Sequence, residues 1–255
     1  MFHETQSIDP MKPTPHHPND LSPILAFGAH PDDIEFGCGA VIAKETRAGC
    51  AAHLVVCSKG EAATNGTPEQ REAEARRAVE LLGATIEFID LDGDAHLQIR
   101  TEHAIKLARI IRTARPGIVL APTLTENQHP DHPRLGRLIR DAARLARYGG
   151  VKELRETPPH TISQLLYYAA SSDAEPPDLP KVLVDVSDPQ IIAAWTAAME
   201  AHASQMTTRK YVELQLTRAR LNGLHAGVEH AIALFPNDPI VVDSLAQIGR
   251  GARSF

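Results

Sequence analysis

The chain has few of the features that mark disulfide-rich, membrane-bound or nucleic-acid-binding proteins. Its 255 residues include three cysteines, an odd number without a Cys-x-x-Cys pair, which argues against a disulfide framework. No apolar run approaches the ~20 residues of a transmembrane helix, and the amino end lacks the apolar core of a secretory signal. The formal charge of −6 gives no support to nucleic-acid or anionic-membrane binding. We therefore expect a cytoplasmic enzyme without nucleic-acid or membrane partners.

The length and composition indicate one globular domain with short flanking segments. Hydrophobic residues make up 43% and charged residues 23% of the chain, as is usual for a folded protein with one substantial core. Residues 1–22 are polar and proline-rich, so we expect an extended or mobile leader. We predict a single domain over residues 23–235 and a carboxy-terminal tail over residues 236–255.

Short apolar runs alternate with helical patterns along the chain. We predict strands at residues 24–29, 51–57, 85–91, 117–122, 164–170 and 181–186. We predict helices at residues 40–47, 68–82, 101–114, 133–148, 188–206 and 211–234. This alternation predicts an α/β fold, a Rossmann-like three-layer sandwich with a mostly parallel sheet. We expect the carboxy-terminal third to cover one sheet edge and to wall the pocket.

The first predicted strand runs directly into three side chains that can bind a metal. His30, Asp32 and Asp33 follow residues 24–29, and the pair Gly37-x-Gly39 comes later. A dinucleotide site needs its glycines directly after the strand. The loop is instead rich in imidazole and carboxylate groups, which favours a bound cation.

A second histidine motif follows the fourth predicted strand, about a hundred residues downstream. It reads His129-Pro130-Asp131-His132. The carboxyl ends of parallel strands meet at one sheet edge, so His30, Asp33 and His132 can come together. Two imidazoles and one carboxylate, with water in the fourth position, form a known catalytic zinc set. Asp32, His129 and Asp131 remain for proton transfer, although spacing alone does not decide between Asp32 and Asp33 as the ligand.

The two motifs together resemble the PIG-L/LmbE family of zinc-dependent deacetylases, and most closely its bacillithiol-biosynthesis branch. These enzymes remove the acetyl group from N-acetylglucosamine units. The resemblance extends in the family's order over roughly residues 23–235. Weaker matching segments lie at residues 59–61, 71–74, 90–93, 143–147 and 202–205.

The resemblance implies a role for each residue of the two motifs. Asp32 is the general base that acts on the water, and His129 as imidazolium stabilises the oxyanion or protonates the leaving nitrogen. Asp131 holds that imidazole in orientation. The implied cofactor is Zn²⁺, or another divalent metal such as Fe²⁺ in the cell. Its implied ligands are His30, Asp33 and His132.

Two further residues are candidates for binding substrate. The resemblance implies that Arg71 contacts the sugar or its attached group; the alternative is a solvent-exposed helix arginine. Glu35 either contacts substrate hydroxyls or places a charge at the start of a helix. Asp92 lies near the pocket or shapes a turn, and His202 with Gln205 lies near the pocket or forms a buried pair. The resemblance also implies a homo-oligomer, a trimer or a hexamer.

The sequence departs from the family pattern just before the second motif. Asn127 and Gln128 stand where family members often carry an acidic residue and an aromatic one. We therefore expect no tyrosine-assisted oxyanion there. The interpretation is a deacetylase that acts on a small N-acetylated sugar conjugate. The alternatives are an amidase for a non-sugar or modified-sugar amide, and a silent sugar- or nucleotide-binding protein.

Overall fold

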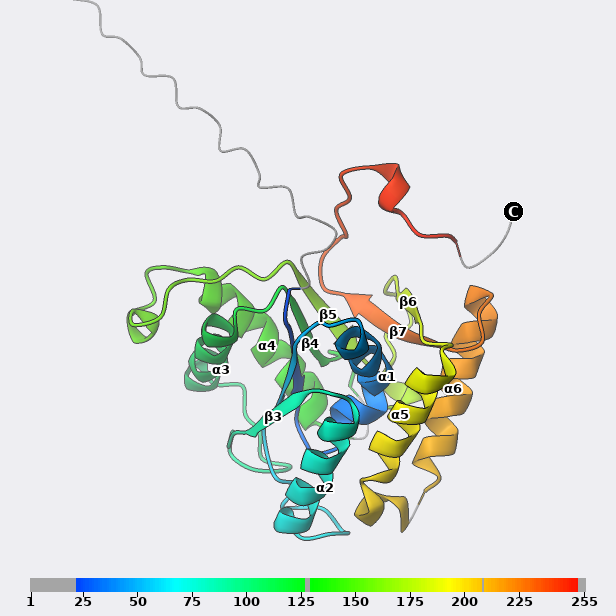
Figure 1. Ribbon diagram of the computed structural model, residues 1–255. Helices are drawn as coiled ribbons and strands as arrows, with labels where there is room; N and C mark the ends of the chain where they lie inside the picture. Colours follow the sequence, from blue (N-terminus) through cyan, green and yellow to red (C-terminus); the bar gives the residue numbers. More distant parts are fainter. Residues whose placement is uncertain (1–21, 127–128, 208, 252–255) are drawn as a thin grey trace, which may run out of the picture.

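The computed structural model describes residues 22–126, 129–207 and 209–251 (Figure 1). The predicted leader, apart from Ser22, and the departures at Asn127 and Gln128 lie outside these residues. Within the described part of the chain, no helix is long and apolar enough to cross a membrane.

The core is one seven-stranded sheet with the strand order β3-β2-β1-β4-β5-β7-β6. Neighbours from β3 to β5 are parallel, whereas β7 runs antiparallel to both β5 and β6. The strands are β1 (Ile24–Gly28), β2 (Ala52–Val56), β3 (Thr85–Phe88), β4 (Ile118–Pro122), β5 (Gln164–Tyr168), β6 (Val182–Asp185) and β7 (Ala231–Pro236).

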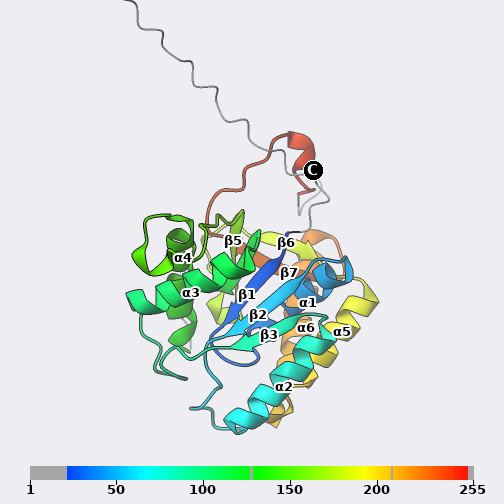
Figure 2. The same ribbon diagram turned by 60° about the vertical axis from the view of Figure 1, so that its left-hand side comes forward.

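Helices cover both faces of the sheet and complete the predicted three layers (Figures 1 and 2). Side chains alternate along each strand, so Ala26 packs on one face while Leu25 and Phe27 pack on the other. One face carries α1 (Asp33–Arg47), α2 (Pro68–Leu81), α5 (Pro189–Glu200) and α6 (Tyr211–Ala226). The other carries α3 (Thr101–Ala114) and α4 (Asp131–Arg147). Short 3-10 helices lie at Lys152–Leu154, Ser172–Ala174, Ala203–Thr207 and Leu245–Gln247.

The carboxy-terminal third differs from the sequence prediction. The predicted helix over residues 211–234 is wrong beyond Ala226, where Gly227 adopts the left-handed conformation (φ 68°) that ends α6. Residues 231–235 form a strand buried on both sides, so their unbroken apolar run carried no period that separates strand from helix. This third therefore extends the sheet through β6 and β7 as well as packing α5 and α6 on one face.

The first helix also begins earlier than predicted, at Asp33 instead of residue 40. Gly37 and Gly39 lie inside this helix, and glycine is needed at both positions because large rings pack directly against the helix backbone. A Cβ at Gly37 would collide with the Tyr168 ring, and one at Gly39 would come within 2.9 Å of Trp195. Close packing, not a turn, explains these glycines.

Arg112, in α3, is a buried arginine that binds the carboxyl end of α4. Its guanidinium donates to the carbonyl oxygens of Ala146 (2.9 Å), Tyr148 (2.6 Å) and Leu154 (2.6 Å). These carbonyls belong to the last turn of α4, to its C-cap residue Tyr148 and to the 3-10 helix that follows, and such helix ends need donors. Arg112 thereby fixes α4 against α3.

We expect Arg112→Met to lower the free energy of unfolding by about 3 kcal/mol, because it leaves several buried carbonyls without donors. Urea denaturation measures this. Arg109→Met is the matched control, since Arg109 lies on the same helix but is exposed and donates to the carbonyl of Glu153; about 1 kcal/mol or less is expected there. Equal losses in both variants would contradict the proposed role of Arg112.

Candidate active site

The candidate site lies at the carboxyl ends of four neighbouring parallel strands. His30 follows β1, Ser58 follows β2, Asp94 follows β3, and the second histidine motif follows β4. The strand order reverses between β1 and β4, and the helices that follow them, α1 and α4, pack on opposite faces. Open α/β sheets bind their ligands in the crevice at such a point.

Asp33 organises the loop between β1 and α1. Its Oδ2 accepts hydrogen bonds from the backbone amides of Ala29 and His30, both at 2.9 Å. Its Oδ1 lies 3.0 Å from Nε2 of His132, at the start of α4. The carboxylate therefore folds its own loop and joins it to the second motif.

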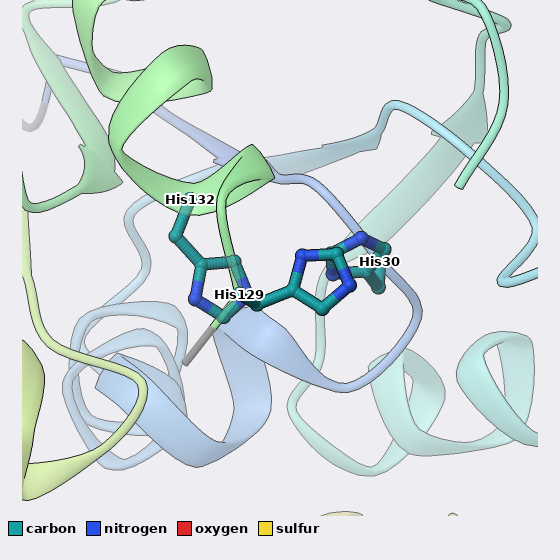
Figure 3. A group of neighbouring side chains, drawn as sticks. All are labelled: His30, His129 and His132. Atoms are coloured by element: carbon teal, nitrogen blue, oxygen red, sulfur yellow. The ribbon is translucent and has the colours of Figure 1, made fainter. Parts of the chain in front are cut away.

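The structure brings three histidines of the two motifs together (Figure 3). The ring centroids of His30 and His129 are 4.2 Å apart, and each lies 5.4 Å from that of His132. One nitrogen from each ring lies within 4.8 Å of the others. Of the predicted ligands, Asp33 contacts both His132 and, at 3.4 Å, Nδ1 of His30. The tight group of three nevertheless contains His129 in place of Asp33.

Asp94 belongs to the site, and the sequence analysis missed it. Its Oδ1 lies 3.1 Å from Nε2 of His30 and 3.4 Å from Nε2 of His129. The neighbouring candidate, Asp92, pairs with Arg100 at 3.3 Å. Both carboxylates follow the carboxyl end of β3, and this position was the sequence signal that could have identified Asp94 as a site residue. The left-handed turn over residues 92–95, with positive φ at Asp92, Gly93 and Ala95, decides which one faces the histidines.

The donor set fits a divalent metal. Among the described residues, Nδ1 of His132 is buried and makes no hydrogen bond. Nε2 of His30 and Oδ1 of Asp94 are also buried, and they lie 3.1 Å apart without forming one. Buried polar atoms are normally satisfied, and imidazole nitrogens with carboxylate oxygens are the ligands of catalytic zinc sites. The cluster at the sheet edge can therefore hold a metal ion.

Burial and charge oppose each other on the carboxylates of the cluster. Burial raises the pKa of Asp33, but the opposing effect of His132 and His30 is larger, so this pKa lies well below the ordinary value. Burial likewise raises the pKa of Asp94, and His129 and His30 overcome this effect. The pKa of Asp131 is lowered in the same way, chiefly by His30. The lowered pKa values favour the ionised form of these carboxylates, which is the form that binds a cation.

His30 shows the complementary shift. Burial lowers its pKa, but Asp33, Asp131 and Asp94 raise it more, so that it lies well above the ordinary value. A metal bound at this ring replaces a proton, and its binding therefore weakens as the pH falls.

Asp32 differs from Asp33 in conformation and partners. It has φ 105° at the N-cap of α1, a left-handed conformation that is rare for a residue with a side chain. Arg71 donates from Nη2 to the carbonyl of Pro31 at 2.8 Å and contacts Asp32 Oδ2 at 3.3 Å. Burial raises the pKa of Asp32 to about 6, although Arg71 opposes the rise.

Arg71 is buried, so its alternative as an exposed helix arginine is wrong. Its predicted contact with the substrate stays a prediction. Thr67 accepts a hydrogen bond from the Gln70 amide at 3.2 Å and so caps the start of α2. Thr67 and Arg71 both belong to the amino-terminal end of α2, and through Arg71 this end contacts Asp32.

Glu35 and His202 form a buried pair behind this loop. Nε2 of His202 lies 3.5 Å from Oε1 of Glu35, and both side chains are almost completely buried. Gln205 instead donates to the carbonyl of Asn65 at 3.0 Å. A contact between Glu35 and substrate hydroxyls stays a prediction, and its burial argues against it.

Asp131 lies at the first position of α4, and its Oδ2 accepts from the Ala95 amide at 2.8 Å. The same oxygen lies 3.5 Å from Nε2 of His30. Asp131 therefore supports both the loop after β3 and the histidine cluster. The predicted role of orienting His129 stays a prediction; the four groups His30, Asp94, His129 and Asp131 offer ligand atoms within 4.8 Å of one another.

The shifted pKa of Asp32 predicts how stability depends on pH in metal-stripped protein. The value rises from ~3.9 in the unfolded chain to about 6 in the fold, so the folded state binds the proton more tightly. Stability is then lost as the pH rises from about 4 to about 6. We expect Asp32→Asn to exceed the wild type by up to about 3 kcal/mol above that window and by little below it.

Urea denaturation across pH measures this difference in free energy of unfolding. The exposed residue Asp178 supplies a control, Asp178→Asn. A gain for Asp32→Asn that is the same at every pH would show that burial of the charge is not its cause.

Comparison with known proteins identifies the relatives of this fold and site. Residues 25–143 match the family model described as PIG-L, GlcNAc-PI de-N-acetylase. A diacetylchitobiose deacetylase of Thermococcus kodakarensis is 30% identical over an alignment of 200 residues, and the match covers 73% of this chain and 71% of that protein. A conserved protein of Thermus thermophilus has a solved structure with 30% identity and a TM-score of 0.74; the match covers 87% of this chain and 97% of that one.

One relative has a different activity. A 4-oxalmesaconate hydratase of Pseudomonas putida is 31% identical over an alignment of 140 residues, and the match covers 50% of this chain and 54% of that protein. The similarity to the Thermococcus deacetylase spans most of both chains, and the match to the family model includes both histidine motifs. On this evidence the chain belongs to the PIG-L family of de-N-acetylases.

Proposed function

We propose that the protein is a zinc-dependent hydrolase that removes the N-acetyl group from a small N-acetylglucosamine-type conjugate. The observation that carries the proposal is that Asp32 and Asp33, although adjacent, have different partners. Asp33 is tied to two backbone amides and to His132, whereas Asp32 is held by Arg71 and has a pKa of about 6. A general base works best when its pKa lies near the operating pH.

His30, Asp33 and His132 are the residues that would hold the ion, in line with the contacts of Asp33 to both rings. When bound, a divalent metal lowers the pKa of water to about 7 and polarises the acetyl carbonyl. His30 and His132 serve as neutral imidazole ligands. Asp33 supplies the carboxylate while its second oxygen keeps the loop folded.

Asp32 receives the proton of the attacking water, and Arg71 keeps its carboxylate in place. His129 has a side chain that is one-third exposed (33%), so it can meet the substrate from the pocket side. As imidazolium it stabilises the developing oxyanion and then protonates the departing nitrogen. Oδ1 of Asp94 lies 3.4 Å from Nε2 of His129, so this carboxylate can hold the ring in position.

The class of substrate follows from the family. Its matching model is named for a GlcNAc de-N-acetylase, and the Thermococcus relative for a diacetylchitobiose deacetylase. An amidase for a non-sugar or modified-sugar amide would use the same residues. One relative is a hydratase, so family membership alone does not establish which bond the enzyme cleaves, and the following experiment tests it. The cytoplasmic location and the trimer or hexamer stay predictions.

Amine release from N-acetylglucosamine and a few of its glycosides tests the proposal. We expect activity in the purified protein, none after chelator stripping, and recovery on adding zinc, because the hydrolysis needs the ion. Bound zinc without amine release from any of these sugars would favour the amidase. Failure to bind a metal at all would refute the proposal.

We expect Asp32→Asn to keep its metal and to lose about 10²- to 10⁴-fold in kcat, the usual contribution of a general base. His132→Ala should lose metal and turnover together. Elemental analysis and steady-state kinetics on the same preparations separate the two effects. Metal loss in Asp32→Asn would mean that Asp32, and not only Asp33, is a ligand.

A further inference from the structure

We propose that the outer face of α6 is an interaction surface for a second copy of this chain, whose own α6 lies antiparallel on the first. In Figure 1, α6 stands at the right-hand side of the molecule, and the segment after β7 reaches toward its upper end. None of the residues assigned above to the candidate active site lies on this helix. The proposal therefore does not depend on the proposed function.

The helix α6 exposes leucines and buries small or polar side chains. Its buried residues are Gln215, Ala219, Asn222 and Gly223. By contrast, Leu214, Leu221 and Leu224 are 44%, 54% and 62% exposed. Within the described part of the chain, none of these three leucines packs against either core of the sheet. A surface helix normally turns its apolar residues inward, so these leucines need a covering that the single chain does not supply.

The three leucines are not scattered over the helix. With the exposed Thr217 they occupy positions 214, 217, 221 and 224, which are separated by alternating steps of three and four residues. Residues at these steps lie on one face of a helix. The same spacing forms the contact line of paired helices, whose side chains fit between those of the facing helix. The pattern therefore indicates that the missing cover is another helix.

The charges beside the leucines indicate which helix this is. Glu213 and Arg220 each stand directly before a leucine of the contact line. In an antiparallel pair these flanking positions face each other, and opposite charges there favour the pairing. Glu213 then faces Arg220 of the partner subunit, and the two-fold symmetry repeats the contact. The face of α6 is thus complementary to itself, as a two-fold contact between identical chains requires.

Both charged residues remain available for this contact. In the single chain Glu213 contacts Lys210 at 3.1 Å, and Arg220 lies 3.9 Å from the Glu229 carboxylate. All four side chains are about half exposed or more. Exposed ion pairs contribute little to stability, so exchanging them for contacts between subunits costs little.

The segment over residues 237–251 enlarges the surface. A stable interface takes about 20 to 30 residues from each partner, whereas α6 has 16. Arg250 donates to the Gly227 carbonyl at 3.4 Å, which brings the segment to the end of α6. The large apolar side chains that this segment exposes are Ile240, Val241, Leu245 and Ile248. With the three leucines of α6 they are seven of the ten such side chains exposed among the described residues.

Sedimentation equilibrium of the full chain tests the inference. Wild type should form a dimer, or a larger assembly with an even number of copies. Leu221→Glu should weaken the association at least about 100-fold, because it places a charge at the apolar contact in both copies. Ile99→Glu is the matched control, since Ile99 is similarly exposed (48%) but lies between β3 and α3, toward the other edge of the sheet. It should associate like wild type, and circular dichroism checks that both variants fold.

An exchange of charges tests the partner and its orientation. Glu213→Arg and Arg220→Glu should each weaken the association about tenfold, because like charges then face each other twice in the contact. An equimolar mixture of the two variants should associate like wild type, since both contacts between unlike copies are again complementary. The double variant Glu213→Arg/Arg220→Glu should also regain wild-type association. Leu245→Glu should weaken it if the segment after β7 takes part.

Several outcomes would overturn the inference. These are a wild type that stays monomeric at high micromolar concentration, a trimer, or a Leu221→Glu variant that associates as wild type does. A mixture of the two charge variants that associates no better than either alone would refute the antiparallel contact. If wild type is the hexamer expected from the sequence, Leu221→Glu should split it into trimers. Sedimentation reads association alone, so its result is independent of whether the protein releases amine from any sugar.

Discussion

The site depends on one carboxylate that performs two tasks at once. Asp33 closes the loop after β1 by accepting two backbone amides, and it contacts His132 on the far side of the crevice. A neutral side chain of the same size would hold the amides less strongly, since bonds to ionised acceptors are shorter and stronger. The loop, the start of α1 and the start of α4 therefore keep their relative positions through a single group.

Much of this architecture could be predicted from the sequence because the patterns that indicate it are local. Strand ends followed by histidine and aspartate indicated both motifs, and the alternation of apolar runs with helical patterns indicated the sheet. Strand β7 was not, because its residues are buried on both sides and lack a period. Asp94 was missed for another reason: the turn that selects it over Asp92 depends on backbone torsions.

The partners of buried charged residues were the least predictable part. Arg71 and Glu35 were both candidates for binding substrate, and the sequence did not indicate that Arg71 contacts Asp32 or that Glu35 pairs with His202. Each contact joins residues far apart in the chain, and charge alone does not say which partner a side chain finds. The glycines of α1 are similar, since their reason lies in the rings of Tyr168 and Trp195.

The three cysteines bear on which metal the protein acquires. All are buried and unpaired by disulfides, and burial raises the pKa of the thiols of Cys38 and Cys57. Neither offers the thiolate that soft ions such as copper(I) prefer. The cluster of candidate ligands consists of histidine nitrogens and aspartate oxygens. Imidazole and carboxylate donors suit zinc and iron(II) alike, so the geometry of the site and the supply of each ion would decide between them.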